Sequence, residues 1–470
     1  MATASERSGL LRCRASGLRM VMVSTALVAM LDSARGESTA SDDPLAPTEA
    51  ISITLPPLDA TERGWVADPG SIPIPARLGF GRVIPEDGLA AALGDPQHWQ
   101  ATADGGQHLV LQVRSPEARA LRLGLAVRAL PERASLRLFT AGSDDLAPIS
   151  GAEIKASLER DRAALPMASA DAADAESLYW SPLLLGDSLM LELTLPSGLE
   201  PQALDLDLVR VSHLFRLPFT LPGERYQGPD DCHVDLACVD DPLLERLARA
   251  TAAVLFTRSD GGSNACTGTL LADADPETRI PYLITAHHCI PDQARASSVE
   301  TFWGHRAEAC GAVPARQPER ITGGADLLSA HESIDTVLLR LRGEPPQTAV
   351  FAHWSARLPE TDTPLISVHH PHGQTAKIAR GRVSHYWNCA DVVYCGANAD
   401  SDAIHYFGVS CLDGLTSGGS SGAGAFRADT GELVGVLTGG LSRCGSPEGP
   451  NDFGRFDCAY RAGLRRWLGR

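Results

Sequence analysis

The sequence predicts an all-β protein with more than one domain, and three observations carry this prediction. The 470 residues include 44 Gly and 32 Pro, which favour many turns over a helical bundle. Apolar and polar residues alternate with a period of two in residues 108–130, 135–142 and 188–198, as in half-buried antiparallel strands. Ten of the 11 cysteines lie after residue 231, so the second half differs chemically from the first. We therefore place a domain boundary near residue 228.

The charge balance excludes two classes of partner. The formal net charge is -17 and the isoelectric point is about 5.3, so the protein repels phosphate backbones and anionic lipid surfaces. Hydrophobic residues make up 44% of the chain, which is enough for packed cores. We expect neither a nucleic acid nor a membrane as partner.

The N-terminus has the pattern of a secretion signal. Arg12, Arg14 and Arg19 precede the apolar stretch MVMVSTALVAML (residues 20–31), and small residues follow it. This run is too short to cross a bilayer, which needs about 20 apolar residues. Residues 1–36 are therefore predicted to be a signal peptide of an exported protein. The alternative is an amphipathic or buried first helix.

The cysteines agree with export. After removal of Cys13 with the signal, an even set remains in one region of the chain, as in a domain stapled by disulfides. Zinc binding is the alternative, but no C-x-x-C pair is present. The set comprises Cys232, Cys238, Cys266, Cys289, Cys310, Cys389, Cys395, Cys411, Cys444 and Cys458.

The first half, residues 37–228, is predicted to be a β-sandwich-like module. Its alternating strands need a second layer to cover their apolar face. Residues 156–177 are Ala-rich and charged, and we expect a helix or a loose loop there. Residues 217–231 have the Pro, Gly and charge content of an exposed linker, where proteases cut. This half contains no recognisable set of nucleophile, base or metal ligands. We therefore interpret it as a folding or binding module.

The second half contains a histidine at the end of a predicted buried strand. In PYLITAHHCI (residues 281–290), the chain leaves the strand through His287, His288 and Cys289. A disulfide in the next residue, with Cys266 as the expected partner, would hold the imidazole in place, as a general base requires. A purely structural histidine is the alternative.

Two further segments complete a catalytic pattern. Asp335 begins the apolar strand IDTVLLRL, and a buried carboxylate needs a donor such as an imidazole N–H. In TSGGSSGAGAF (residues 416–426), glycines around the serines allow a tight turn whose N–H groups form an oxyanion hole. Taken singly, each segment has an alternative interpretation. Asp335 would be a strand-start cap, and the Gly/Ser run would be a flexible linker. The order His, Asp, Ser is that of chymotrypsin-like β-barrels.

These segments carry a family resemblance. The second half contains DCHVDLAC, CTGTLL, YLITAHHC, DTVLLRL, SVHHPHGQTAK, GLTSGGSSG, LVGVLTGGLSRC and NDFGRF. Together they resemble the bacterial lysyl endopeptidases, secreted members of the trypsin-like serine proteases, over residues 231–467. The resemblance implies a trypsin-like double β-barrel catalytic domain at residues 229–470, preceded by a pro-region.

The resemblance also implies the roles of individual residues. The histidine directly before the cysteine is the base, which selects His288. Asp335 is the residue that orients it. The second serine of G-S-S-G is the nucleophile, which selects Ser421. Gly419 and Ser421 supply the oxyanion N–H groups.

The same resemblance implies three disulfides, which join Cys232 to Cys444, Cys238 to Cys310, and Cys266 to Cys289. The other four cysteines have no counterpart, and three connectivities are open to them. The simplest joins Cys389 to Cys395 across a local loop and leaves Cys411 to pair with Cys458.

The specificity pocket is expected to use an acid placed after the nucleophile. Trypsins carry an acid six residues before the nucleophile, but Leu415 holds that position here. The lysyl endopeptidases draw a pocket aspartate from a later segment, which Asp452 matches with one gap and Asn451 would match with another. Asp413 is a second candidate acid, although Asp-Gly is also a turn signal.

The resemblance implies two further pocket residues. Trp387 matches a pocket tryptophan of the family, and Thr438 stands where the family has a histidine. Because ammonium and guanidinium differ in size and donor geometry, the preference for Lys or Arg stays open. Arg225 lies in the linker and no lysine does, so self-processing would require cleavage after arginine.

The sequence thus predicts a secreted monomeric serine endopeptidase, made as a zymogen, that needs no cofactor. Its partners are protein or peptide substrates and its own pro-region. His369, His370 and His372 would offer imidazoles to a metal, but HHP resembles a structural segment of the family and we expect no metal. The alternative function is a catalytically inactive protease fold that acts as a secreted binding module.

Overall fold

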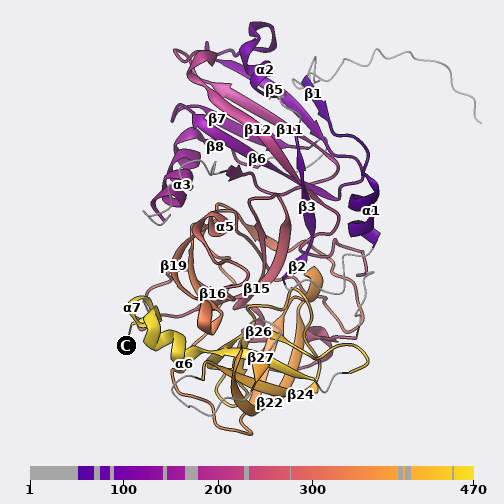
Figure 1. Cartoon of the computed structure of the whole chain (residues 1–470), viewed down its shortest axis with the longest axis vertical. Helices are drawn as coiled ribbons and strands as arrows, with labels where there is room; N and C mark the ends of the chain where they lie inside the picture. Colours follow the sequence, from indigo (N-terminus) through magenta and orange to yellow (C-terminus); the bar gives the residue numbers. More distant parts are fainter. Residues whose placement is uncertain are drawn as a thin grey trace, which may run out of the picture. The chain divides into compact units, whose positions relative to one another are not determined.

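The first half of the chain forms two β-sheets that face each other across an apolar core. A computed structural model describes residues 51–67, 75–84, 89–140, 146–164, 178–226, 232–275, 277–389, 395–396, 404–446 and 449–469. One sheet has the strand order β1-β5-β11-β7-β8, with β4 beside β5, and the other has the order β10-β6-β12-β3, with β9 beside β6 (Figure 1). These strands are β1 (Ile51–Thr54), β3 (Gly79–Val83), β4 (Gln100–Ala101), β5 (Gln107–Arg114), β6 (Ala120–Ala129), β7 (Ser135–Phe139), β8 (Ile149–Ser150), β9 (Leu178–Trp180), β10 (Leu184–Leu185), β11 (Ser188–Leu195) and β12 (Asp205–Leu214).

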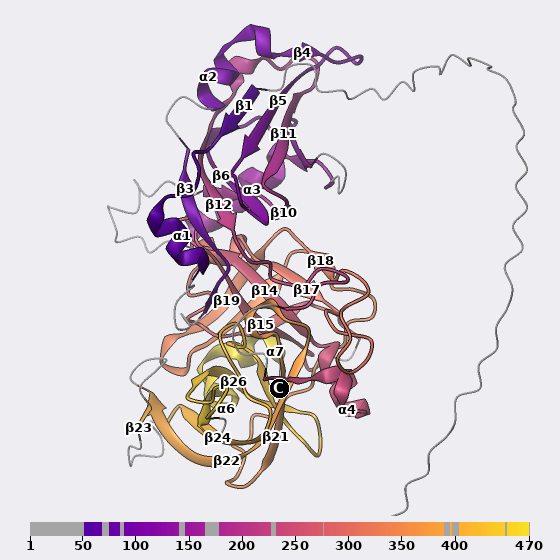
Figure 2. The ribbon, with the colours of Figure 1, turned by 90° about the vertical axis from the view of Figure 1, so that its right-hand side faces the viewer.

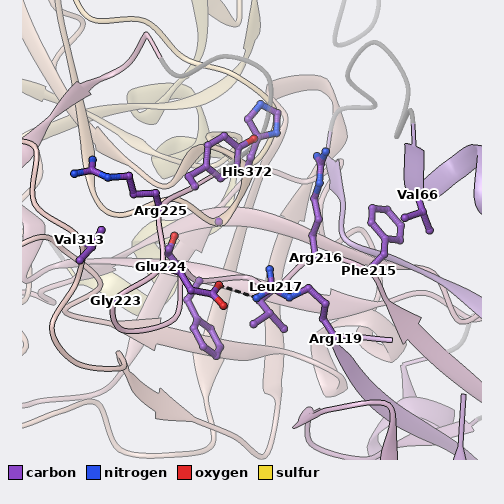
Figure 3. A pocket seen from close by; sticks show the side chains of 14 residues that line it. Val66, Arg119, Phe215, Arg216, Leu217, Gly223, Glu224, Arg225, Val313 and His372 are labelled. Carbon is purple, nitrogen blue, oxygen red and sulfur yellow. Dashed lines mark hydrogen bonds and ion pairs between the residues drawn. The ribbon is translucent and has the colours of Figure 1, made fainter. Parts of the chain in front are cut away.

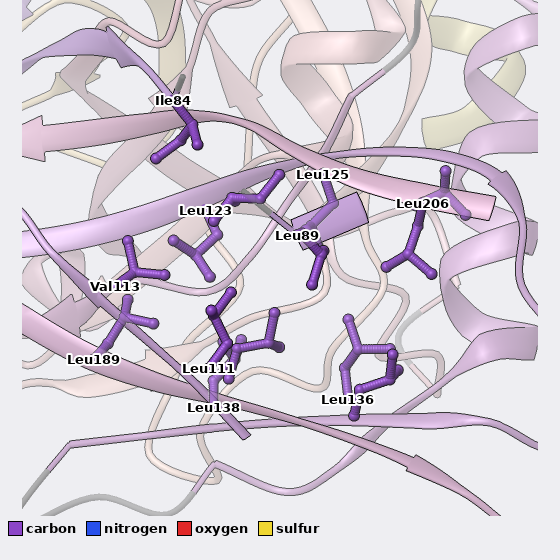
Figure 4. Close-up of a cluster of buried hydrophobic side chains, with 14 of the residues drawn as sticks. Ile84, Leu89, Leu111, Val113, Leu123, Leu125, Leu136, Leu138, Leu189 and Leu206 are labelled. Carbon is purple, nitrogen blue, oxygen red and sulfur yellow. The ribbon is translucent and has the colours of Figure 1, made fainter. Parts of the chain in front are cut away.

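The core between these sheets is built mainly from leucine. Along β5 and β11, buried and half-buried residues alternate, as the period-two pattern predicts. Leu111, Leu123 and Leu191 are at most 1% exposed, and Figure 4 shows side chains of this cluster from both sheets. Burying each such side chain contributes about 1.5–3 kcal/mol.

Strand β6 departs from the predicted half-buried pattern. Eight consecutive residues of β6, from Ala120 to Val127, are buried, so both of its faces are covered. The inner face packs in the sandwich core, whereas Ala120 packs in a second cluster with Ala253, Leu255 and Phe302 of the second half. The alternation in sequence could not reveal this second cover.

Helices are short and lie between the strands. Part of the Ala-rich segment is helical: α3 begins after Ser150, whose hydroxyl accepts from Glu153 N–H while the Glu153 carboxylate accepts from Ser150 N–H. Residues 165–177 of that segment lie outside the described residues. The helices are α1 (Ala60–Ala67), α2 (Leu89–Gly94), α3 (Gly151–Ala163), α4 (Pro242–Ala248), α5 (Gln293–Ser297), α6 (Phe456–Ala459) and α7 (Arg465–Leu468).

The second half forms two antiparallel sheets, which we call the first and the second barrel and which are visible in Figures 1 and 2. The first has the order β18-β17-β14-β15-β16-β20-β19, and the second the order β13-β22-β21-β25-β26-β27-β24, which closes because β24 also pairs with β22. Their strands are β13 (Val234–Asp235), β14 (Thr251–Thr257), β15 (Ser263–Leu271), β16 (Tyr282–Thr285), β17 (Glu300–Trp303), β18 (Glu319–Ile321), β19 (Ala325–His331), β20 (Thr336–Leu341), β21 (Pro364–His369), β22 (Lys377–Cys389), β23 (Cys395–Gly396), β24 (Tyr406–Asp413), β25 (Gly424–Arg427), β26 (Leu433–Gly440) and β27 (Pro450–Arg455). The all-β, trypsin-like fold predicted from the sequence is confirmed.

Three disulfides join the pairs that the resemblance implies, Cys232–Cys444, Cys238–Cys310 and Cys266–Cys289. The simplest pairing of the remaining cysteines is wrong for Cys411 and Cys458, since both are free thiols. Cys411 accepts from Asn451 Nδ2 at 2.9 Å, whereas Cys458 lies in α6 beside Ile404 O, so the two point to different partners. The side chains of Cys389 and Cys395 lie outside the described residues.

The two halves share a sheet. The two-residue strand β2 (Ala76–Arg77) pairs with β15 of the first barrel, and Leu78 N–H donates to Ser263 O at 2.8 Å. Strand pairing of this kind adds main-chain hydrogen bonds to an exposed edge. Residues 49–470 accordingly form one compact unit. The predicted signal peptide, residues 1–36, lies outside the described residues.

The buried guanidinium of Arg122 is a second link between the halves. Its Nη1 donates to Thr257 Oγ1 and its Nη2 to Ser298 O, both at 2.8 Å, while Nη2 also lies 3.3 Å from Glu300 Oε1. Arg122 and Glu300 are each 1% exposed. A buried charge is tolerated only when it is paired and hydrogen-bonded, as Arg122 is.

The predicted exposed linker is only partly exposed. Leu217 and Phe219 are buried, because they pack with Phe302 and other residues of the first barrel. Residues 222–225 are exposed, and residues 227–231 lie outside the described residues. The apolar side chains at the start of this segment therefore override its Pro and Gly content.

Among the described residues, no helix combines the length and the apolar character needed to cross a membrane.

Candidate functional site

His288 lies just after β16 and is held by one carboxylate. Asp335 Oδ1 accepts from the His288 backbone N–H at 2.8 Å, and Asp335 Oδ2 lies 2.7 Å from His288 Nδ1. The carboxylate thereby fixes both the main chain and the ring of the same histidine. Because Nδ1 donates to this acceptor, the second ring nitrogen, Nε2, is left as the base.

The backbone of Asp335 adopts a special conformation. Asp335 follows a short 3₁₀ turn (Glu332–Ile334) with φ 49° and ψ 46°, in the left-handed region that only a few non-glycine residues enter. Its carbonyl accepts from His287 N–H at 3.2 Å, and Asp335 is 4% exposed. The strand β20 that starts at the next residue therefore presents a buried carboxylate to the end of β16.

The disulfide expected beside His288 lies against its ring. A ring nitrogen of His288 and the sulfurs of Cys266 and Cys289 all lie within 4.8 Å of one another. Both sulfurs are bonded to each other, so they offer no thiolate to a metal. This cross-link ties β15 to the segment that carries the histidine.

The loop with Ser421 is hydrogen-bonded to β15 and lies close to the end of β16. Ser421 O accepts from Thr267 N–H of β15, and Gly419 O accepts from Thr267 Oγ1, both at 2.8 Å. Gly422 has φ +87°, and a Cβ there would lie 2.9 Å from Ala286 N, directly before the histidines. Only glycine allows this close approach, which brings Ser421 into the neighbourhood of His288.

Two N–H groups of this loop are available to a ligand. Among the described residues, the N–H groups of Ser420 and Gly422 donate to Ser417 O and Leu437 O, but those of Gly419 and Ser421 donate to no backbone carbonyl. Gly419 has φ +93°, and a Cβ there would lie 2.7 Å from His372 N. An oxyanion hole is built from such unengaged donors next to a nucleophile.

His288 Nε2 has no hydrogen-bond partner among the described residues, although it is buried. Ser421 itself is 3% exposed. In enzymes without substrate, the hydrogen bond between nucleophile and base is often long and tightens only when substrate binds. The chemistry of this triad stays a prediction.

Asp452 is a buried carboxylate in the second barrel. It lies in β27 opposite Gly408 of β24 and Gly439 of β26, so its cross-strand neighbours have no side chain. Burial raises the pKa of Asp452 to about 7, and the Trp387 side chain opposes this rise. Asp452 Oδ1 and Trp387 Nε1 nevertheless lack a hydrogen-bond partner among the described residues. An unpaired buried carboxylate of this kind favours a cationic ligand.

His385 is a further residue of this region and was not among the predicted site residues. His385 and Trp387 lie two residues apart on β22, and their rings meet edge to face with centroids 3.9 Å apart. The period of two along a strand, which places both on one face, was the signal for this contact. Thr438 is buried on β26, and its Oγ1 has no hydrogen-bond partner among the described residues.

The two alternative pocket residues, Asn451 and Asp413, occupy other environments. The Asn451 carboxamide accepts from Thr416 Oγ1 and Ser442 Oγ and donates to Cys411, so it is engaged in structural hydrogen bonds. Asp413 has a half-exposed side chain that lies 4.0 Å from Arg380. Neither presents an unpaired buried oxygen as Asp452 does.

Leu415, the position at which trypsins carry an acid, is buried. An apolar side chain there leaves the pocket charge to another residue.

The three histidines considered for a metal have separate partners. His369 Nδ1 lies 2.8 Å from Ser420 Oγ, His370 Nδ1 lies 3.1 Å from Gln374 O, and His372 stacks on Tyr226 with centroids 6.2 Å apart. Burial lowers the pKa of His370 to about 4. The rings of His369 and His370 are therefore neutral, and all three histidines belong to the scaffold behind the serine loop.

The linker borders a cavity of about 840 Å³ next to this scaffold. Figure 3 shows Arg225 and His372 at its wall and the ion pair of Arg119 with Glu224, whose atoms lie 2.7 Å apart. Its lining does not include His288, Asp335 or Ser421. The cavity is thus a feature of the linker region and not of the candidate triad.

Family models match both halves of the chain. Residues 58–215 match a model described as the lysyl endopeptidase N-terminal domain, and residues 227–454 match one described as the lysyl endopeptidase C-terminal domain. A lysyl endopeptidase of Pseudomonas aeruginosa strain PAO1 is 31% identical over 415 residues, which cover 84% of this chain and 82% of that protein.

Solved structures are similar at lower levels. The active form of the Rv3671c protease from M. tuberculosis is 15% identical, with a TM-score of 0.35, over 53% of this chain and 94% of that one. The HtrA-type protease AlgW with a tripeptide is 16% identical, with a TM-score of 0.34, over 48% of this chain and 64% of that one.

Proposed function

Because the chain belongs to the lysyl endopeptidase family and is a serine protease, we propose that it cleaves peptide bonds through Ser421, His288 and Asp335. One observation carries the assignment: Asp335 binds both the N–H and Nδ1 of His288, which leaves Nε2 buried and unpartnered on the side away from the carboxylate. The Ser421 loop is hydrogen-bonded to Thr267 of the neighbouring strand. A nucleophile, an oriented base and a carboxylate form the minimal acyl-transfer set.

The reaction follows from these positions. His288 Nε2 takes the proton of Ser421 Oγ as that oxygen bonds to the scissile carbonyl carbon, and the carbonyl electron pair moves onto its oxygen. The tetrahedral species collapses when the C–N bond breaks, and His288 returns the proton to the leaving amine. Water then attacks the acyl-enzyme with His288 again as base, which releases the acid and free Ser421.

Gly419 and Ser421 stabilise the charge on the carbonyl oxygen. Their N–H groups donate to no backbone carbonyl among the described residues, so they are free to bind the oxyanion. Loss of one such donor typically costs about 10²–10³ in kcat.

The substrate residue before the cleaved bond is basic in our proposal. Asp452 supplies the charge, with Trp387 and Thr438 beside it, and a bound cation restores the partner that its Oδ1 lacks. His385 narrows the same region through its contact with Trp387. The guanidinium of Arg is a planar fork of donors, whereas the ammonium of Lys is a compact point charge. The space beside the rings of His385 and Trp387 therefore decides which of the two side chains is preferred.

We further propose a secreted zymogen. Residues 1–36 direct export, and residues 37–228 are a pro-region that is cut from the catalytic domain, residues 229–470. Arg225 is exposed in the linker, and the segment after it leads to Cys232, which the disulfide to Cys444 retains in the catalytic domain. Cleavage near this point would break the covalent connection between the two halves, but strand β2 would still pair with β15.

Substitution of the nucleophile tests the function. Ser421→Ala should abolish casein hydrolysis and labelling by a serine-directed phosphonate, whereas the exposed Ser333→Ala should leave both unchanged. Retained hydrolysis in Ser421→Ala would refute the assignment. Intact casein with the unmodified protein would instead favour the binding module.

A defined peptide mixture tests the specificity. Mass spectrometry of the fragments should show cleavage after Lys, Arg or both. Asp452→Asn should remove this preference, and a preference that survives the substitution would contradict the assigned acid.

A further inference from the structure

Ser420, the neighbour of the proposed nucleophile, ties the serine loop together from behind. Its side chain is fully buried. Ser420 Oγ accepts from Ser417 N–H at 3.1 Å, and Ser420 N–H donates to Ser417 O at 2.9 Å, so two reciprocal bonds close a tight ring. These two hydrogen bonds fix the conformation of the turn, and with it the direction of the N–H groups of Gly419 and Ser421.

His369, in the second barrel, contacts this hydrogen-bonded turn. It is the last residue of β21, it is fully buried, and its Nδ1 lies 2.8 Å from Ser420 Oγ. Burial, with the nearby His233 ring as the next cause, keeps the pKa of His369 well below its ordinary value. The ring is therefore neutral and acts as a polar contact rather than a charge.

His233 approaches the same loop from the start of the predicted catalytic domain. Its Nε2 lies 3.0 Å from Ser417 Oγ, and its ring meets that of His369 edge to face at 6.0 Å. His233 is itself fixed on both sides, since Cys232 is bonded to Cys444 and β13 pairs with β22. Two imidazoles from distant parts of the chain thus bind the two serines of one turn.

We infer that His369 is a positioning residue, which acts through Ser420 Oγ to set the oxyanion N–H groups of Gly419 and Ser421, with His233 as a second anchor on Ser417. The inference rests on the proposed function, because it assigns a purpose to the geometry of the Ser421 loop. His369 does not touch the reacting atoms. Its contribution is preorganisation, because residues that contact the substrate keep their geometry only when neighbouring residues hold them in place.

This role has a kinetic signature that packing alone does not give. The oxyanion donors act on charge that exists only in the transition state, so a displaced loop lowers kcat and leaves KM nearly unchanged. A peptidyl aldehyde, whose adduct with Ser421 is tetrahedral, should lose affinity to the same extent as kcat falls. A peptide product that lacks the tetrahedral centre should bind as before.

Two substitutions of His369 separate hydrogen bonding from volume. His369→Leu fills the space without a donor or acceptor, and we expect kcat per titrated active site to fall about 10- to 100-fold. His369→Asn places an amide near the Nδ1 position and should recover kcat to within about fivefold of the unmodified enzyme. Equal kcat in both variants would overturn the inference, as would a loss that appears only in KM.

Ser420→Ala carries the test should the His369 variants not fold, because it removes a single buried oxygen. This oxygen serves both His369 and Ser417 N–H, so kcat should fall at least as far as in His369→Leu. Adding His369→Leu to Ser420→Ala should lower kcat little further, because the hydrogen bond between the two residues is already lost. Unchanged kcat in Ser420→Ala, or fully additive losses, would also overturn the inference.

The matched control is His213→Leu. His213 Nδ1 lies 2.8 Å from Ser115 Oγ in the pro-region, an equally buried His–Ser pair outside the loop. Its loss should leave kcat per titrated site unchanged. Failure of the proposed function is distinguishable, because it would show as hydrolysis by Ser421→Ala and not as an altered kcat of the His369 variants.

Discussion

Asp335 binds His288 twice, with Oδ1 on the backbone N–H at 2.8 Å and Oδ2 on ring Nδ1 at 2.7 Å. The main-chain bond fixes where the histidine is, and the side-chain bond fixes how its ring is turned. Because Asp335 is buried and its backbone is held in the left-handed region, the carboxylate has little freedom to follow another partner. The pair is therefore preorganised before any substrate binds.

Asp335→Asn should keep the fold and lose catalysis. The amide presents a donor to one of the two His288 groups and so stabilises the wrong tautomer, which costs about 10⁴ in kcat in such triads. Steady-state hydrolysis of a peptide substrate, with thermal unfolding as a check on the fold, measures this. The exposed Glu332→Gln nearby is the control and should be as active as the unmodified enzyme. A loss below tenfold in Asp335→Asn would mean that another group orients the ring.

Asp452, the proposed pocket acid, should make substrate discrimination depend on pH. Because burial raises the pKa of Asp452 to about 7, the carboxyl is largely neutral at pH 5 and charged at pH 9. The ratio of kcat/KM for a substrate with a basic residue to that for its apolar analogue should therefore rise with pH through about 7. The ratio cancels the titration of groups that serve both substrates. A ratio that does not vary between pH 5 and 9 would exclude Asp452 as the pocket acid.

The same carboxyl also affects stability. Its folded pKa lies above the unfolded value, so between about pH 4 and 7 the folded state binds more protons than the unfolded state, and the free energy of unfolding falls as pH rises. Asp452→Asn should thus raise the melting temperature at pH 8 and leave it unchanged at pH 4. An equal effect at both values would show that burial of this charge is not what destabilises the fold.

The candidate triad could be predicted because each member adjoins a strong local pattern. His288 follows an apolar strand, Asp335 begins one, and Ser421 stands in a run of glycines. The packing behind them could not be predicted in this way. His369 and His233 reach the serine loop through contacts between segments far apart in sequence, and no period within either segment indicates them.

The relation of the two halves was likewise hidden. Strand β2 has only two residues, which is too short for a recognisable alternation. Arg122 stands in β6 at a position that reads as solvent-facing, and only the barrel that covers it explains its burial. The exposed linker prediction was wrong only for the start of the segment, since Leu217 and Phe219 pack against apolar residues of the first barrel, whereas residues 222–225 are exposed.

Arg122→Met should destabilise the full chain. The substitution leaves Thr257 Oγ1 and Ser298 O without their donor and removes one of the cations beside Glu300, which Arg320 still contacts at 2.7 Å. Removal of one partner from a buried pair costs about 3–5 kcal/mol, and urea unfolding of Ser421→Ala protein, which cannot cut itself, measures the change.

Arg128→Met is the matched control on the same strand. Arg128 pairs with Asp205 at 2.7 Å, but both side chains are about half exposed, and such surface pairs contribute about 0–1 kcal/mol. Equal destabilisation by the two substitutions would mean that the buried contacts of Arg122 do not join the halves.

His305 should make the folded chain sensitive to acid. His305 Nε2 accepts from Thr220 N–H of the linker at 3.0 Å, and burial, followed by the neighbouring His370, lowers the pKa of His305 to about 3. Below pH 6.5 the unfolded state therefore binds a proton that the folded state excludes. The free energy of unfolding then decreases as the pH is lowered, by up to about 1.4 kcal/mol per pH unit. His305→Gln keeps an acceptor for Thr220 without a titrating ring, so urea unfolding between pH 5 and 6 should show a smaller slope than in the unmodified chain. The exposed His353→Gln should leave the slope as it is. The same slope in all three proteins would show that exclusion of this proton does not contribute to acid unfolding.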